Sequence, residues 1–137
     1  YNPLKDVYKT EVFRLMRWRN KHTPDDLLGG DKPCPERIIT KPPSAELRPD
    51  QKDSDSLPPY PVLDDILMGL IEHEQPVEDI IERGHDPKIV SRIQNLLYIN
   101  EYKRRQAPPG VKIGSKNFGR DRRYPITNRY RDAVPEK

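Results

Sequence analysis

The sequence predicts a mostly α-helical chain with long irregular loops. Apolar residues recur at helical spacing in four separate segments, and no segment shows the strict alternation that is typical of a half-buried strand. The 137 residues include 16 prolines, and only 33% of them are hydrophobic. Long stretches therefore have little apolar surface to offset the entropy of ordering, so partial disorder of the soluble chain is one open interpretation.

A first helix is predicted over about residues 5–20. Its apolar stripe comprises Tyr8, Val12, Leu15 and Met16, which lie at i, i+4, i+7 and i+8. Thr23-Pro24 ends the helix, because a residue before proline is disfavoured in helical conformation. Residues 24–37 are rich in helix breakers and are predicted to form a loop.

An irregular segment is predicted from Ile38 to Pro61. It combines several prolines with a specific mixture of polar residues, including Lys41 and Ser44, which a pure spacer would not need. A structureless loop of this length in a compact domain is a binding loop, a lid or disordered. On the residues alone, these three interpretations stay open.

Residues 61–106 are predicted to form a compact helical unit. Pro61 is suited to a first helical turn, and a short helix after Pro76 ends at Gly84. Asp86-Pro87 opens a further helix, which runs to Pro108-Pro109. The two main stripes comprise Val62, Leu63, Ile66, Leu67, Leu70 and Ile71, and Ile89, Val90, Ile93, Leu96 and Leu97.

Charge is unevenly distributed along the chain. The whole chain has a net charge of +3, whereas residues 101–137 hold eleven Lys/Arg against four Asp/Glu. The basic, irregular tail at residues 107–137 predicts a phosphate-bearing partner, although a solvated tail has the same composition.

No complete catalytic or metal-binding constellation is visible. There is no glycine-rich phosphate loop, no Cys/His metal spacing and no serine–histidine–acid set. Cys34 is the single cysteine, which excludes an internal disulfide and favours a reducing, cytoplasmic environment. No apolar run reaches transmembrane length, so no membrane partner is expected.

Four segments carry a resemblance to a known family. They are KPPSAELRPDQKDSDSLPPYPVLDDIL (41–67), EYKRRQAPPGVKI (101–113), FGRDRRYPITNRY (118–130) and NPLKDVYKTEVFRL (2–15). In this order they resemble the closing part of the glutamine-dependent NAD synthetases.

The resemblance implies that residues 1–137 form the C-terminal part of a synthetase domain with a doubly wound α/β fold, of the adenine nucleotide alpha hydrolase type. The helix within residues 1–23 would dock on the parallel sheet supplied by upstream sequence. The parent enzyme would use ATP with Mg²⁺ to adenylate deamido-NAD, and ammonia from a glutaminase domain would displace AMP. The phosphate loop and the magnesium ligands would also lie upstream, so the isolated segment is expected to be inactive. A homo-oligomer is expected.

The resemblance also implies individual site residues. Lys9 matches a lysine that contacts ATP phosphates. Residues 38–61 match a mobile loop that binds substrate and ATP, and Ser44 matches the Ser/Thr of this loop that touches ATP. Tyr102 and Lys103 match a pair that contacts deamido-NAD, although the ammonia-using branch has histidine at the first position. No catalytic residue and no metal ligand is expected within this segment.

Two other functions remain open on the residues alone. The turn at residues 83–86 joins two helices with helix-turn-helix spacing, and the second of these ends in Lys103-Arg104-Arg105. That pattern is compatible with a nucleic-acid-binding module, but the acidic first half of the chain is not, and we expect no nucleic-acid partner. Alternatively, the helices serve only in assembly with other polypeptide segments.

Overall fold

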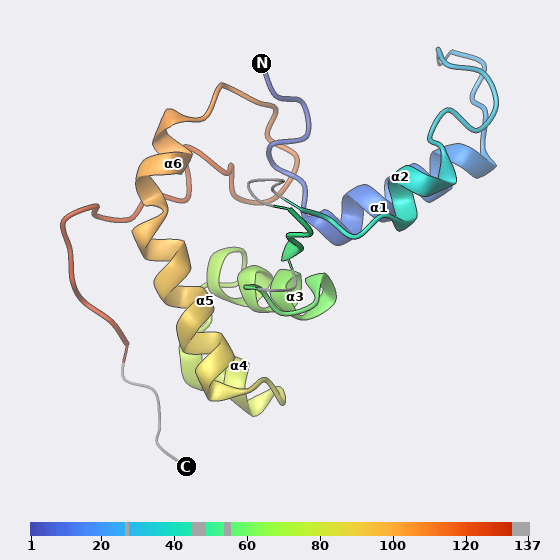
Figure 1. Cartoon of the computed structure of the whole chain (residues 1–137). Coiled ribbons are helices and arrows are strands. Elements are labelled where there is room, and N and C mark those ends of the chain that lie inside the picture. The colour runs from blue at the N-terminus through green and yellow to red at the C-terminus, as the bar shows by residue number, and fades with distance from the viewer. Residues whose placement is uncertain (27, 45–48, 54–55, 133–137) are drawn as a thin grey trace. The chain divides into compact units, whose positions relative to one another are not determined.

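The computed structural model describes residues 1–26, 28–44, 49–53 and 56–132. Within this part of the chain the regular structure is entirely helical (Figure 1), which confirms the predicted mostly α class. The helices are α1 (Lys9–Lys21), α2 (Glu36–Thr40), α3 (Tyr60–Ile71), α4 (Val77–Glu82), α5 (Pro87–Ile99) and α6 (Glu101–Gln106).

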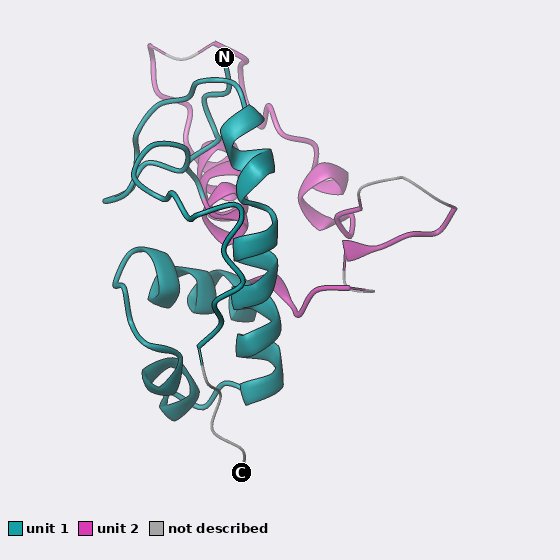
Figure 2. Ribbon diagram, turned by 90° about the vertical axis from the view of Figure 1, so that its left-hand side faces the viewer, with its two compact units in different colours: residues 1–7, 61–137 teal, residues 8–60 magenta. Residues whose placement is uncertain are grey.

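The chain divides into two compact units (Figure 2). Unit 1 consists of residues 1–7 and 61–137, and unit 2 consists of residues 8–60. Unit 1 therefore joins the start of the chain to its second half, so its architecture depends on contacts between residues about a hundred positions apart.

The core of unit 1 is made by α3, α4 and α5. Its most buried side chains come from the two predicted apolar stripes and from the short helix between them. Gly69 allows α3 to approach α4 closely, because a Cβ at this position would lie 3.1 Å from Cδ1 of Ile80. The buried apolar residues of unit 1 are Leu63, Ile66, Ile71, Val77, Ile80, Val90, Ile93 and Leu97.

The turn between α4 and α5 forms as its residues predict. Gly84 adopts a φ of +102°, a conformation that is costly for residues with a Cβ. The Asp86 carboxylate then caps α5 by accepting hydrogen bonds from the backbone N–H groups of Lys88 (2.7 Å) and Ile89 (3.3 Å). α4 packs directly against α5.

The predicted fourth helix is divided at Asn100. The side-chain amide of Asn100 donates a hydrogen bond to the carbonyl of Leu96 (2.8 Å), and its backbone N–H bonds to the same carbonyl (3.2 Å). This side chain competes with the helical backbone pattern and ends α5 at Ile99. α6 then starts at Glu101, so the expectation of one helix continuing to the proline pair was wrong.

The predicted first helix begins later than expected. The stripe suggested a start near Lys5, but α1 starts at Lys9, and residues 3–7 form turns. The Asp6 side chain is engaged with the tail of unit 1, a tertiary contact that sequence periodicity does not reveal.

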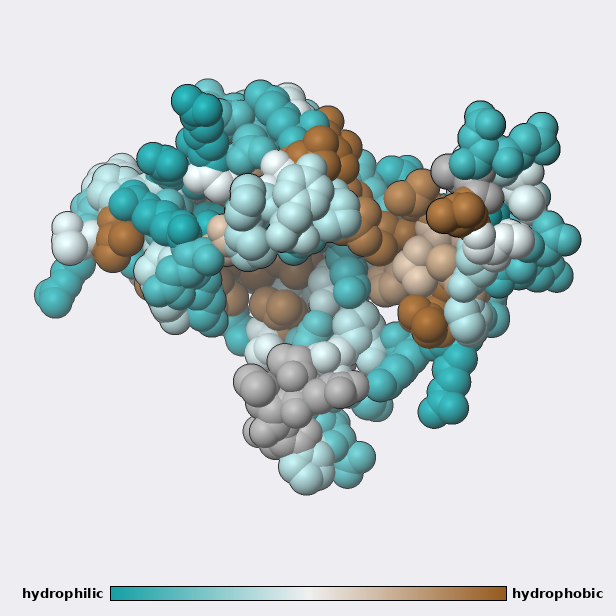
Figure 3. Space-filling view, turned by 90° about the horizontal axis from the view of Figure 1, so that it is seen from above, coloured by the Kyte–Doolittle hydropathy of each residue, from teal (hydrophilic) through white to brown (hydrophobic). Residues whose placement is uncertain are grey.

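Unit 2 is less well packed than unit 1. α1 lies against α2, a short helix that was not predicted, but α1 has no buried residue, and Leu15 and Trp18 are about half exposed. Figure 3 shows one face of the chain, where separate hydrophobic patches interrupt the hydrophilic surface. Ile39 of α2 is the buried apolar residue of the described part of unit 2.

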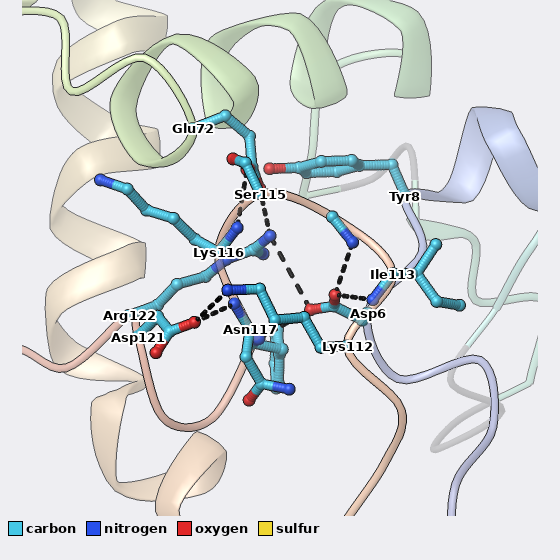
Figure 4. Close-up of polar contacts among 12 residues, drawn as sticks. Asp6, Tyr8, Glu72, Lys112, Ile113, Ser115, Lys116, Asn117, Asp121 and Arg122 are labelled. Carbon is cyan, nitrogen blue, oxygen red and sulfur yellow. Dashed lines mark hydrogen bonds and ion pairs between the residues drawn. The ribbon is translucent and has the colours of Figure 1, made fainter.

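The Asp6 carboxylate organises the tail of unit 1. Although only 5% exposed, it accepts hydrogen bonds from the backbone N–H groups of Ile113 (2.7 Å), Gly114 (2.8 Å) and Phe118 (2.7 Å), as Figure 4 shows in part. Arg122 lies 3.9 Å from the same carboxylate and also pairs with Glu72 after α3. A single buried anion thus holds residues 113–122 in a closed loop.

The start of the chain is fastened to this loop at a second point. Asn2 donates its backbone N–H to the carbonyl of Pro109 (2.9 Å), and the Lys5 ammonium donates to the carbonyl of Pro108 (2.8 Å). The approach requires glycine at residue 110, because a Cβ there would lie 2.5 Å from the Asn2 carbonyl oxygen. In Figure 1 the blue N-terminal segment accordingly runs beside the orange tail that follows α6.

Burial by itself would raise the pKa of Asp6, but the three backbone N–H donors and the positive charge of Arg122 outweigh it and lower the pKa below its ordinary value of 3.8. Since the folded-state pKa is lower than the unfolded-state pKa, Asp6 stabilises the fold fully above pH 3.8. This stabilisation is lost as pH falls through the folded-state pKa.

Replacement of Asp6 by asparagine is predicted to destabilise unit 1. One neutral amide oxygen cannot accept three N–H bonds as a buried carboxylate does, and we expect a loss of about 1–3 kcal/mol at pH 7. Urea denaturation of the two proteins measures the difference, which should shrink as the pH is lowered through the acid range. Asp25→Asn, at an exposed position of unit 2, is the control; equal stability of wild type and Asp6→Asn at pH 7 would contradict the assigned role.

Candidate functional site

Lys9 lies at the first residue of α1 in unit 2. Its side chain is exposed, and its ammonium lies over the rings of Phe13 (5.5 Å) and Tyr60 (5.9 Å). No carboxylate of the described residues lies within ion-pair distance of it. The two aromatic faces position the ammonium while leaving its positive charge uncompensated, a state that suits contact with an anion.

Ser44 lies in the same unit, in the irregular segment that follows α2. Its side chain is half-buried, and it immediately precedes residues 45–48, which are outside the described part of the chain. The predicted binding loop at residues 38–61 is therefore described only in part, and its mobility stays a prediction.

Tyr102 and Lys103 lie side by side on α6 in unit 1. Both are exposed, and the Lys103 ammonium lies 5.9 Å from the centre of the Tyr102 ring. Successive residues of a helix are rotated by about 100°, so these two side chains share the side of α6 that faces away from Glu101. The structure therefore brings together this predicted pair.

Glu101 anchors the other side of α6. It is 1% exposed, and its carboxylate accepts hydrogen bonds from Arg104 (2.5 Å) and Arg105 (3.1 Å). Arg104, itself buried, also donates to the Leu97 carbonyl (2.8 Å), which ties α6 back to α5. This triad fixes the rotation of α6 and thereby the outward direction of Tyr102 and Lys103.

Burial of Glu101 would raise the pKa of its carboxyl group, but the hydrogen bonds from Arg104 and Arg105 and the charge of Arg104 outweigh burial and lower the pKa below its ordinary value of 4.5. The carboxylate is consequently ionised at neutral pH, and its pairs with the two arginines persist there.

A basic depression in unit 1 was not predicted from the sequence. It has a volume of about 730 Å³, and its described lining contains no Asp or Glu. The charge excess of residues 101–137 was the only sequence signal for it, because Lys5 reaches it from the opposite end of the chain. The cations that line it are Lys5, Arg104, Arg105, Lys112, Arg120 and Arg123.

Two further kinds of feature, a metal-ligand cluster and a membrane-spanning helix, are absent from the described residues. The described residues contain no group of three or more His, Cys, Asp or Glu side chains that could hold a metal ion. Within the same residues, no helix combines the length and apolar character needed to cross a bilayer.

Comparison with known proteins identifies the family. The family model described as NAD synthase matches residues 1–107. The chain belongs to the NAD synthase family. Family membership, which the four sequence segments predicted, is thereby confirmed, and the nucleic-acid-binding alternative is not favoured.

Curated proteins that are similar to this chain carry the name glutamine-dependent NAD(+) synthetase, and two of them show the extent of the match. The protein from Rhodobacter capsulatus is 53% identical over 133 residues, which cover 96% of this chain and 24% of that protein. The protein from Thermotoga maritima is 47% identical over 131 residues, covering 96% of this chain and 22% of that protein. The chain thus spans about a quarter of the length of the relatives it matches.

A solved structure gives the same relationship. The glutamine-dependent NAD+ synthetase from Acinetobacter baumannii, in complex with adenosine diphosphate, aligns with a TM-score of 0.51 and 42% sequence identity. The alignment covers 90% of this chain and 20% of that chain. The helical arrangement described above therefore occurs within a larger NAD synthetase.

Glu101→Gln is predicted to destabilise α6 and its junction with α5. Removal of the carboxylate leaves the buried Arg104 without its counter-charge, which typically costs on the order of 3 kcal/mol. Thermal or urea denaturation measures the loss, and hydrogen exchange should show that amides of α6 lose protection first. Glu82→Gln, at an exposed position at the end of α4, should change neither property; unaltered protection of α6 in Glu101→Gln would show that the triad does not hold this helix.

Proposed function

We propose that this chain is part of a ligase that makes NAD from deamido-NAD, ATP and ammonia derived from glutamine. The observation that carries the proposal is the family match over residues 1–107, together with about 50% identity to proteins named glutamine-dependent NAD(+) synthetase. In this reaction the nicotinate carboxylate attacks the α-phosphate of ATP, which forms an adenylate and releases diphosphate. Ammonia then displaces AMP and forms the amide.

Lys9 is proposed to contact the ATP phosphates. Its exposed ammonium is held against two aromatic rings without a carboxylate partner among the described residues, so its charge is available to oxygens that become more negative during adenylation. Ser44 is proposed to touch ATP from the adjoining loop, with residues 38–61 closing over the bound nucleotide. The ADP complex of the A. baumannii relative supports nucleotide binding in this family.

Tyr102 and Lys103 are proposed to contact deamido-NAD. The Glu101–Arg104–Arg105 triad directs both side chains outward from α6, where the ammonium can meet a carboxylate or phosphate. The rigid triad reduces the conformational entropy that this contact would lose on binding.

The rest of the active site is proposed to lie outside this chain. A doubly wound α/β core would supply the phosphate loop and the sheet against which α1 docks, and a glutaminase domain would supply ammonia. The partly exposed apolar side chains of α1 fit such a partner surface. The described residues do not form a ligand set for Mg²⁺, and the core would supply the ligands of this ion. A homo-oligomer of the whole enzyme is also proposed.

The proposed function is tested by comparing the intact protein that contains this chain with the isolated 137 residues. With ATP, Mg²⁺, deamido-NAD and glutamine, the intact protein should form NAD, AMP and diphosphate, and ammonium should replace glutamine. The isolated chain should form none of these products. Absence of NAD from the intact protein, or turnover by the isolated chain, would refute the respective part of the proposal.

Lys9→Ala in the intact protein is predicted to slow adenylation by a free-energy difference of ~2–4 kcal/mol, because a charge contact in the transition state is lost. Single-turnover release of diphosphate measures this step directly. Ser44→Ala should weaken ATP binding with a smaller effect on the rate, and Lys21→Ala, exposed at the end of α1, serves as the matched control. A Lys9→Ala enzyme with the wild-type rate of diphosphate release would remove Lys9 from the site.

A further inference from the structure

The basic depression of unit 1 combines cations from three separate parts of the chain. Lys5 comes from the first residues, Arg104 and Arg105 come from α6, and the other three cations come from the loop at residues 112–123. The Asp6 carboxylate and its backbone hydrogen bonds hold the first and third of these parts together. The depression is therefore a product of tertiary structure and not a run of consecutive basic residues.

The cations of the depression are only partly neutralised. Glu101 pairs with Arg104 and Arg105, and Asp121 pairs with Lys112 at 3.0 Å, a contact drawn in Figure 4. Lys5, Arg120 and Arg123 have no carboxylate within ion-pair distance among the described residues. Two carboxylates against six cations leave an excess of four positive charges around one concave surface.

Several of these cations are held in position before any ligand binds. Lys5 donates to the carbonyls of Pro108 (2.8 Å) and Ala107 (3.4 Å), and the Arg123 side chain donates to the Gly119 carbonyl (3.3 Å). Arg104 is only 7% exposed, and its Nε has no hydrogen-bond partner in the described part of the protein. Cations whose charges repel one another are costly to hold together, and an anion that binds among them relieves this cost.

The excess of four positive charges favours a multiply charged anion such as a phosphate group over a singly charged carboxylate or an apolar ligand. Four of the six cations are arginines, whose planar guanidinium groups bind phosphate oxygens in pairs. The volume lies within the range of small-molecule sites and exceeds what one phosphate would fill. The depression lies on the side of α6 opposite to Tyr102 and Lys103, so it is a different surface from the one those residues occupy.

We propose that this depression binds a diphosphate group. Arg120 and Arg123, both exposed and lacking a carboxylate partner, contact its oxygens, while Lys5 and Arg105 supply further charge. The diphosphate could be free or could be the centre of a dinucleotide, and both sources share this chemistry. The proposal uses only residues of unit 1 and their charges, so it does not depend on the proposed ligase activity.

The test is calorimetric titration of the intact protein with inorganic diphosphate, compared with the double variant Arg120→Gln/Arg123→Gln. We expect the wild-type protein either to bind one more diphosphate per chain than the variant, or to have a dissociation constant lower by on the order of tenfold for each arginine retained. Binding at this site should weaken strongly as the salt concentration rises. Lys88→Gln/Arg92→Gln, which removes two exposed cations of α5, should retain wild-type binding. Both double variants replace exposed side chains, and circular dichroism checks that they fold.

The remaining outcomes separate the sources and the alternatives. Displacement of diphosphate from the arginine-dependent site by NAD would assign the site to a dinucleotide, whereas failure to displace it would assign the site to free diphosphate. Identical stoichiometry and affinity in wild type and Arg120→Gln/Arg123→Gln would overturn the proposal. Binding of sulfate at this site as tightly as diphosphate would also overturn it. The same holds if a duplex oligonucleotide binds through Arg120 and Arg123 and displaces diphosphate.

Discussion

The buried carboxylate of Asp6 is the interaction on which unit 1 depends. It brings residues from the start of the chain to the backbone of residues 113–118, and it shares Arg122 with Glu72. A carboxylate is suited to this role because it can accept several N–H bonds at once and remain ionised when they are present. The loop at residues 112–123 has no regular secondary structure. The Asp6 carboxylate therefore accepts backbone N–H bonds that carbonyl groups would accept in a helix.

The same principle operates at α6, where the buried Glu101 holds two arginines in place. A helix of six residues is too short to be stable alone, and its orientation is decided by the ion pairs and the bond from Arg104 to Leu97. As a result, α6 presents Tyr102 and Lys103 on one side and Arg104 and Arg105 on the other. Under the two proposals made above, this one short helix contacts deamido-NAD on its outer side and a diphosphate group in the basic depression.

Elements specified by local chemistry were predicted well. The apolar spacing of α3 and α5, the Asp86 cap and the left-handed Gly84 follow from interactions within a few residues, and the structure has each of them. The start of α1 and the division at Asn100 were predicted wrongly, because a competing side-chain contact decides each of them. Of the predicted site residues, Tyr102 and Lys103 lie together because they are adjacent on a helix. The roles of these two residues and of Lys9 and Ser44 remain predictions.

By itself, the sequence determined the helical class, the apolar core of unit 1 and the family, since these depend on local periodicity and on motifs that can be read along the chain. Only the tertiary structure decided which charged residues are buried and which cations converge. Asp6 and Arg122 are separated by more than a hundred residues, and nothing in their neighbourhoods distinguishes them from exposed charges. Lys5 and Arg120 likewise line one depression although they are far apart in the sequence. They meet because the buried carboxylate of Asp6 requires N–H donors, and the donors that satisfy it, such as Ile113, belong to the far end of the chain.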